Sequence, residues 1–420
     1  MCTIEWLIGS EDNFSISEDT MIVRKLFPLF VGLILIVVFL PASAAPQLTP
    51  TPESFTLTPA PTATPTPQPE WKPEESDFNA ALEEVLDPFF SIYIEKVGIT
   101  GFSVGVVKDN KIVYAKGFGV RDFETQEPVT AYSLFHMASI SKPFVSTAIM
   151  QLVEQGKIDL DEPLVTYLTY FKLDDDRYKE ITIRQMLSHV SGMPRAMDYH
   201  WDQPEYDEEA LERYVRSLAD EKLIFTPGDE FSYSNVAYEV LGDVIAKVSG
   251  QPFEDYEKEN ILVPLGMHQS TFLKKEVPPE LETTPHLDEG VVSEIYPYNR
   301  AHAPSSTLHS NVLEMSNWAI ANMNRGTFND MKILSESTYD LLWTPHEQVK
   351  TGVSIGLGWF LKTSGEGDWV FHDGGDVGFR TSFTMLPEES IAVTILANDE
   401  QLNPRSMADM VIKLIHDIEP

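Results

Sequence analysis

Two residues in the first half of the chain have the types and spacing of a nucleophile and its base. Ser139 is followed three positions later by Lys142. A serine hydroxyl reacts near neutral pH only when a base takes its proton. A lysine amine can act as that base when burial or a nearby cation lowers its pKa. The alternative is a helix-capping serine beside a solvated lysine, and the pair alone does not decide between the two.

A helix is expected to position this pair. Apolar residues recur at helical spacing over residues 142–155, and Gly156 ends the pattern. Pro143 fits only near a helix start, where its missing N–H is no loss. We therefore expect Ser139 at the helix N-terminus, with Lys142 one turn away on the same face. The free N–H groups of that terminus would also stabilise an oxyanion.

A second cluster places a tyrosine and an asparagine just before another helical pattern. Tyr233 and Asn235 end a turn-rich stretch, and residues 235–248 are strongly periodic. A phenol relays protons when a neighbouring cation lowers its pKa, and an asparagine amide both donates to and accepts from a substrate amide. The alternative is that Asn235 caps the helix and Tyr233 packs in the core.

A third cluster follows a predicted strand near the C-terminus. The strand ends in His372, and Gly374 and Gly375 would allow a ligand to approach the backbone closely. The alternative is a glycine-rich hairpin with an incidental histidine. A metal site made of His372, Asp373 and Asp376 is disfavoured, because no second histidine lies at ligand spacing.

One further motif is interpreted as a coincidence. Residues 101–105 match G-x-S-x-G around Ser103. That motif requires a strand, a sharp turn and then a helix. Here the sequence continues as a strand into a hairpin, so Ser103 is expected to be a small residue on a packed strand.

The N-terminal 44 residues are predicted to be a leader. The apolar run at residues 26–40 follows a basic pair and precedes the small-residue cleavage signal at residues 42–44. Residues 1–20 are acidic where a signal peptide is basic, so Met21 is the expected true start. We expect export to the cell surface or beyond. The runner-up is an uncleaved membrane tether through residues 26–40, although 15 apolar residues are short for a span.

Composition limits the other classes of function. The formal net charge of -35 argues against nucleic acid as a partner. The single cysteine, Cys2, precedes the expected cleavage point, which excludes disulfides and a thiol nucleophile from the mature protein. Residues 45–74 are rich in proline and threonine and are expected to form an extended linker. The folded domain is then expected to occupy residues 75–420.

Secondary-structure patterns in that domain predict an α+β fold. A helix is expected at residues 77–96, followed by a strand hairpin turning at residues 109–110. Mostly helical patterns fill the middle, with helices expected at residues 207–218, after an acidic start, and at residues 312–323, and short strands return near the C-terminus. These strands are expected at residues 357–361, 369–372, 380–386 and 391–397. One antiparallel sheet built from both ends is therefore expected, with flanking helices and a helical insertion over about residues 160–310.

The three clusters together resemble the serine hydrolases related to class C β-lactamases, D-alanyl-D-alanine carboxypeptidases and family VIII esterases. S-I-S-K at residues 139–142 matches S-x-x-K, Y-S-N at 233–235 matches Y-x-N, and H-D-G at 372–374 matches K-T-G or H-x-G. Further similarity lies at residues 187–194 and in G-L-G-W at 356–359. The resemblance covers about residues 77–400 and implies a β-lactamase/transpeptidase-like fold.

The resemblance also implies catalytic roles. Ser139 would attack a carbonyl group and form an acyl-enzyme, while Lys142 and Tyr233 would share the general acid and base work. Which of the two deprotonates the serine is left open. The backbone N–H groups of Ser139 and Gly375 would form an oxyanion hole, in which one donor contributes roughly 2.7–4 kcal/mol to transition-state stabilisation. No metal or organic cofactor is implied.

The same resemblance assigns substrate contacts. Asn235 would hold the substrate amide, and His372 and Gly374 would line the site, with His372 contacting a substrate carboxylate or the tyrosine. His372 replaces the lysine of class C β-lactamases, and a neutral imidazole binds a carboxylate less strongly than an ammonium. Residues 303–308 replace a glycine-rich turn of the relatives, which leaves substrate choice open.

The predicted function is an exported serine hydrolase that cleaves amide or ester bonds by acyl-enzyme chemistry. Its substrates would be D-amino-acid peptides, cell-wall peptides or small esters, with peptidoglycan as the macromolecular partner. Two alternatives remain: a catalytically silent peptidoglycan-binding or surface protein on the same fold, and a genuine β-lactamase.

Overall fold

The structure is a computed structural model that describes residues 70–195, 198–288, 290–364 and 367–418. The predicted leader and most of the predicted linker lie outside the described residues. All described residues belong to one compact unit, Pro65–Pro420. None of the helices in the described ranges combines the length and apolarity needed to cross a bilayer.

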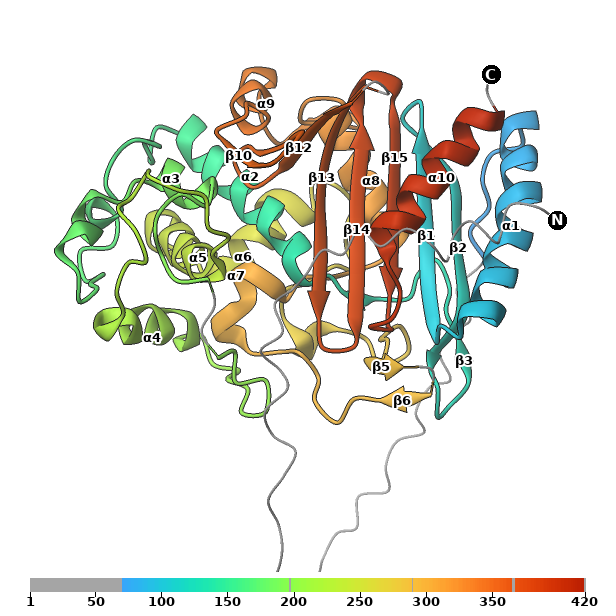
Figure 1. Ribbon diagram of the computed structural model, residues 1–420, viewed down its shortest axis with the longest axis horizontal. Helices are drawn as coiled ribbons and strands as arrows, with labels where there is room; N and C mark the ends of the chain where they lie inside the picture. The colour runs from blue at the N-terminus through green and yellow to red at the C-terminus, as the bar shows by residue number, and fades with distance from the viewer. Residues whose placement is uncertain (1–69, 196–197, 289, 365–366, 419–420) are drawn as a thin grey trace, which may run out of the picture. The chain divides into compact units, whose positions relative to one another are not determined.

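A nine-stranded antiparallel sheet forms the centre of this unit, in the order β10-β11-β12-β13-β14-β15-β1-β2-β3 (Figure 1). The strands are β1 Gly101–Lys108, β2 Lys111–Asp122, β3 Glu127–Pro128, β10 Glu347–Lys350, β11 Val353–Ile355, β12 Phe360–Ser364, β13 Gly367–Asp376, β14 Phe379–Leu386 and β15 Ile391–Ala397. Strand β1 pairs with β15, so Phe102 lies opposite Ala397. The expected sheet built from both ends of the domain is confirmed.

Helices cover both faces of the sheet (Figure 1). They are α1 Asp77–Val97, α2 Ser141–Glu154, α3 Ile183–Leu187, α4 Ala210–Ser217, α5 Asn235–Ser249, α6 Phe253–Glu257, α7 Ala303–Ser306, α8 Val312–Met323, α9 Glu336–Leu342 and α10 Pro404–Ile418. Helices α1 and α10 pack together on the outer face. Helices α2, α5 and α8 belong to the larger core on the inner face. The short paired strands β4 Phe135–His136 and β7 His309–Ser310 lie on the inner side.

The predicted hairpin between β1 and β2 is confirmed. Asp109 and Asn110 both adopt positive φ angles of 49° and 61°, as a two-residue hairpin turn requires. The strand carrying Ser103 is buried over residues 101–107 and continues into this hairpin. It therefore lacks the strand–turn–helix geometry that a nucleophile elbow needs, and the interpretation of G-x-S-x-G as a coincidence is confirmed.

Two local expectations were wrong. The strand expected at residues 357–361 begins only at Phe360, because Gly358 adopts a left-handed φ of 81°. A Cβ at Gly358 would lie 1.9 Å from Ser146 Oγ of α2, so glycine permits this close approach. The helix expected to begin at residue 207 begins at Ala210.

Candidate active site

Ser139 lies in a short turn directly before α2, rather than within the helix. The 3₁₀ turn η1 spans Ala138–Ile140, and α2 begins at Ser141. Ala138 has a left-handed φ of 48°, which is costly for a residue with a Cβ. Between residues 133 and 152, Ser139 is the one residue that is not buried. The turn thus presents this hydroxyl at the edge of a closely packed core.

Lys142 lies one turn further along, as the spacing predicted. Its Nζ is 3.1 Å from Ser139 Oγ and 2.9 Å from the carbonyl oxygen of Ser305 on α7. The side chain is fully buried. Burial lowers the pKa of Lys142 to about 7, and the charges of Glu239 and Asp376 oppose this shift. A large fraction of the amine is therefore neutral near pH 7 and can accept a proton.

Tyr233 lies over the same amine. Lys142 Nζ is 5.0 Å from the centroid of the Tyr233 ring, and the imidazole of His189 stacks on that ring at 4.3 Å. Burial raises the pKa of Tyr233, an effect that the neighbouring Ser139 hydroxyl partly offsets. The phenol is therefore protonated near neutral pH, so Tyr233 is a proton donor there while Lys142 is the available base.

Asn235 is the first residue of α5, so the alternative in which it caps that helix is wrong. The N-cap is Ser234, whose Oγ accepts a hydrogen bond from the Ala237 N–H. The backbone N–H of Asn235 donates to the carbonyl of Arg195. Its Oδ1 is buried and has no partner among the described residues. An unpaired buried acceptor is costly unless a ligand satisfies it.

His372 is buried on β13, and its tautomer follows from its contacts. Nδ1 lies 2.8 Å from the carbonyl oxygen of Asp373, which can only accept, so Nδ1 carries the proton. Nε2 is then an acceptor, and it has no partner among the described residues. Burial, assisted by the charge of Lys142, lowers the pKa of His372 to about 3. The imidazole is neutral under ordinary conditions.

The glycines after His372 bring β13 against the turn that carries Ser139. A Cβ at Gly374 would lie 2.4 Å from the Met137 carbonyl oxygen and 2.3 Å from Thr381 Oγ1. Thr381 Oγ1 donates to that same carbonyl at 3.0 Å. Gly375 is the next residue of the strand, paired with Arg380 of β14. All seven predicted site residues therefore lie on elements that converge around the Lys142 amine.

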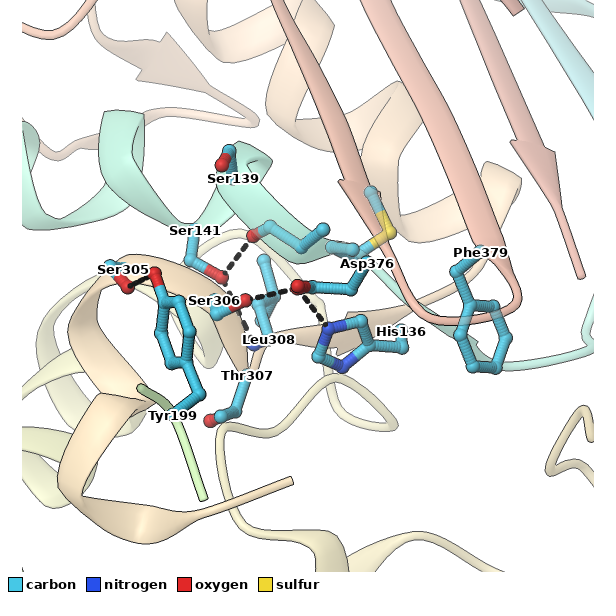
Figure 2. A network of polar contacts seen from close by, with 12 residues as sticks. His136, Ser139, Ser141, Tyr199, Ser305, Ser306, Thr307, Leu308, Asp376 and Phe379 are labelled. Atoms are coloured by element: carbon cyan, nitrogen blue, oxygen red, sulfur yellow. Dashed lines mark hydrogen bonds and ion pairs between the residues drawn. The ribbon is translucent and has the colours of Figure 1, made fainter. Parts of the chain in front are cut away.

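The sequence interpretation did not identify the polar network beneath this site. Asp376 Oδ2 accepts hydrogen bonds from His136 Nε2, at 2.9 Å, and from Ser306 Oγ (Figure 2). Ser141 Oγ donates to the Ala138 carbonyl and accepts from the Leu308 N–H. These contacts tie η1, α7 and β13 together. Their partners are far apart in the sequence, so no local pattern could have indicated them.

Two other features were considered as sites. A groove of about 1200 Å³ runs between the residues leading into α1 and strands β2 and β3. None of the predicted site residues lines it, so the chemistry lies elsewhere. Among the described residues, no group of three or more histidine, cysteine, aspartate or glutamate side chains is arranged to hold a metal ion.

An antiparallel sheet between helical layers, with a serine just before an inner helix and a lysine in the first turn of that helix, is the architecture of the β-lactamase-like serine hydrolases. The family model described as Beta-lactamase matches residues 79–416. The chain therefore belongs to the beta-lactamase family, which confirms the resemblance and the fold class that were predicted from the three motifs.

Individual relatives agree with this assignment. The chain is 24% identical to Protein flp of Staphylococcus aureus (strain MW2), over 75% of this chain and 63% of that protein. It is 27% identical to a penicillin-binding protein, number 4*, of Bacillus subtilis (strain 168), over 75% and 72%. The octameric penicillin-binding protein homologue from Pyrococcus abyssi has a TM-score of 0.71 and 28% identity, covering 79% of this chain and 77% of that one. The chain thus spans less than two thirds of the length of the Staphylococcus relative.

Proposed function

We propose that this chain is an exported serine hydrolase that forms an acyl-enzyme at Ser139. The observation that carries the proposal is the position of the buried Lys142 amine, 3.1 Å from Ser139 Oγ. With a pKa of about 7, this amine has a neutral fraction at physiological pH. A base with a pKa near the working pH is the most effective general base.

In the proposed reaction, Ser139 Oγ attacks a substrate carbonyl carbon as neutral Lys142 takes the hydroxyl proton. The oxyanion that forms is bound by the backbone N–H groups of Ser139 and Gly375. The proton then passes to the leaving group from Lys142, with protonated Tyr233 as its partner. Water attacks the resulting ester by the reverse route, which releases the acid and restores Ser139.

The substrate is proposed to present hydrogen-bond donors to this site. Asn235 Oδ1 and His372 Nε2 are both buried acceptors without partners in the described part of the chain. The unprotonated Nε2 of His372 would repel a carboxylate rather than bind it. This argues against the carboxylate contact expected for His372 and favours esters and amides that carry an N–H or O–H group.

A cation near the site is available for a substrate that does carry a carboxylate. The charge of Arg195 lowers the pKa of Tyr233, although burial raises that pKa more strongly, and the Arg195 side chain is exposed. D-amino-acid peptides and cell-wall peptides therefore remain in the proposed range beside small esters. The terminal carboxylate of such a peptide would bind Arg195 instead of His372.

The test is turnover of a panel of p-nitrophenyl esters, D-amino-acid amides, peptidoglycan-derived D-peptides and β-lactams by the full chain. We expect hydrolysis of esters or D-amino-acid amides that Ser139→Ala abolishes, with the β-lactams hydrolysed poorly. Tight binding across the panel without turnover would instead support the catalytically silent alternative. Efficient β-lactam hydrolysis would overturn the substrate assignment.

Export is the second part of the proposal. Its support is the apolar run at residues 26–40 with its cleavage signal, which lies outside the described residues. N-terminal sequencing of the protein recovered from the cell surface and medium distinguishes cleavage after Ala44 from a retained membrane tether. Recovery of the protein only from the cytosol would contradict export.

A further inference from the structure

A buried carboxylate, that of Glu239, contacts the segment that replaces the relatives' glycine-rich turn and that also holds the Lys142 amine. Glu239 belongs to the second turn of α5 and is 1% exposed. Its Oε1 accepts a hydrogen bond from Ser305 Oγ at 2.6 Å and another from His302 Nδ1 at 3.1 Å. Oε2 is buried without a partner among the described residues. A carboxylate with so little solvation is stabilised mainly by these two donors and by nearby positive charge.

The two donors lie at and beside α7, the helix whose backbone holds Lys142. The carbonyl oxygen of Ser305 accepts from Lys142 Nζ at 2.9 Å, while the side chain of the same residue donates to Glu239. Ser305 therefore contacts both charged groups, the Glu239 carboxylate through its side chain and the Lys142 amine through its backbone carbonyl. Tyr199 OH also lies 3.3 Å from Ser305 Oγ, as the dashed line in Figure 2 marks.

The packing of α7 on α5 leaves Ser305 little freedom. Gly242, three residues after Glu239, lies on the same face of α5. A Cβ at Gly242 would lie 2.1 Å from Pro304 Cγ. Pro304 of α7 thus packs directly against α5. The hydrogen bond to Glu239 then fixes the orientation of the neighbouring Ser305 side chain.

The charge of Glu239 also acts on the amine. Burial lowers the pKa of Lys142, and Glu239 is the first of two carboxylates that oppose the shift, with Asp376 the second. The titratable groups that surround the amine are Glu239 and Tyr238 on α5, Tyr233 just before α5, His189 after α3, and His372 and Asp376 on β13. Asp376 is already engaged by His136 and Ser306.

We propose that Glu239 is a positioning residue of this hydrolase: it holds the Ser305 carbonyl against Lys142 and places a carboxylate near the amine that deprotonates Ser139. This inference rests on the proposed function. Without the carboxylate, the buried amine would lose its proton at lower pH and would be a weaker base. In this proposal, the segment at residues 303–308 holds the Lys142 base in position and also lies beside the substrate.

The test is the pH dependence of kcat/KM for p-nitrophenyl butyrate hydrolysis by the full chain and Glu239→Gln. The acidic limb of the profile reports protonation of the free base. We expect Glu239→Gln to move this limb down by roughly one pH unit, the lower end of what an opposite charge within a few ångströms produces. The maximal rate should also fall, because the base is weaker. Glu239→Asp, which keeps the charge, should restore the limb to its original position.

Two further variants separate positioning from stability. Glu314 of α8 is another buried helical carboxylate that accepts from a serine hydroxyl, that of Ser270, and it is not among the charges that shift the pKa of Lys142. Glu314→Gln should destabilise the fold and leave the acidic limb in place. Ser305→Ala keeps the charge of Glu239 and removes its link to α7, so kcat should fall roughly tenfold, as expected for the loss of one hydrogen bond to a charged group.

These experiments distinguish a failure of the Glu239 inference from a failure of the proposed function. If the full chain shows no Ser139-dependent turnover, the proposed function is wrong. If turnover depends on Ser139 but Glu239→Gln leaves the limb unmoved, the role of Glu239 in tuning Lys142 is wrong. Should Glu239→Gln fail to fold, an unaltered kcat in Ser305→Ala overturns the positioning role on its own.

Discussion

Strand β13 presents successive side chains to two different surroundings. His372, Gly374 and Asp376 point to the inner face, where they meet Tyr233, η1 and the buried Ser306. Asp373, between them, points to the outer face and pairs with Arg405 of α10 at 2.8 Å. The alternation is the ordinary geometry of a strand, but the two faces differ in how well their polar groups are satisfied.

On the outer face, the polar side chain that β13 presents is paired. Asp373 accepts from two nitrogens of Arg405, whose guanidinium also lies 4.0 Å from the Phe371 ring centroid. On the inner face, buried acceptors such as His372 Nε2 and Asn235 Oδ1 lack partners in the described part of the chain. Unsatisfied buried groups reduce stability, so two unpaired acceptors on the elements that carry the predicted site residues indicate where a ligand binds.

The largest expected effect comes from removing the base on the inner face. Lys142→Met should reduce kcat by about a thousandfold or more, because the neighbouring Tyr233 phenol is protonated near neutral pH and cannot take the Ser139 proton. The fold should persist, since methionine fills the same buried space without a charge. Steady-state kinetics measure the loss of kcat, and circular dichroism measures whether the fold persists. Activity within tenfold of the unaltered protein would assign the base role elsewhere.

Adjacent glycines give a direct comparison of the two faces. An added Cβ at Gly374 would clash with the Met137 carbonyl, while one at Gly375 meets only the Arg380 side chain, at 3.5 Å. Gly374→Ala should displace the Ser139 turn and cost about a hundredfold in kcat, as a misplacement of about 1 Å does. Gly375→Ala should stay within a few fold. Equal effects from the two substitutions would remove the distinction between the faces.

The pH profile gives a smaller effect. Because neutral Lys142 is the active form and its pKa is about 7, kcat/KM should fall about tenfold per unit as pH drops below 7. In the unfolded chain the amine titrates near 10.5, so the unfolded state binds more protons between pH 7 and 10.5, and stability should rise with pH across that window. Lys142→Met should flatten this rise in denaturant titrations.

The smallest expected effects come from two aspartates of β13. Asp376→Asn disrupts two buried hydrogen bonds and should lower the free energy of unfolding by about 2–3 kcal/mol. Asp373→Asn weakens a partly exposed ion pair, with the aspartate side chain 42% exposed, and should cost less than about 1 kcal/mol. Chemical denaturation measures both. A larger loss from Asp373→Asn would show that the outer ion pair stabilises the fold more than its exposure suggests.

Much of the fold could be predicted from sequence, because its elements are long and periodic. Helix α8 and strand β15 were predicted at their observed bounds, Val312–Met323 and Ile391–Ala397. The edge strand β10 and its neighbour β11 were not predicted, since both are short and β10 is polar and mostly exposed. Helix α4 begins later than its acidic start indicated, because the preceding residues form a turn.

The site could be predicted only as far as its motifs extend. Ser139, Lys142 and Tyr233 belong to short patterns with recognisable chemistry. Glu239 was missed because it lies among apolar helix residues, and only the fold brings α7 against it. The tautomer of His372 depends on the Asp373 carbonyl, a backbone contact that no sequence pattern contains.

The central claim, that Ser139 is the nucleophile activated by Lys142, is tested most directly by covalent labelling. The full chain is treated with a fluorophosphonate probe, and the modified peptide is identified by mass spectrometry. The account predicts one adduct on Ser139, absent in Ser139→Ala and formed much more slowly in Lys142→Met. Labelling that persists in Ser139→Ala but disappears in Ser103→Ala would contradict it.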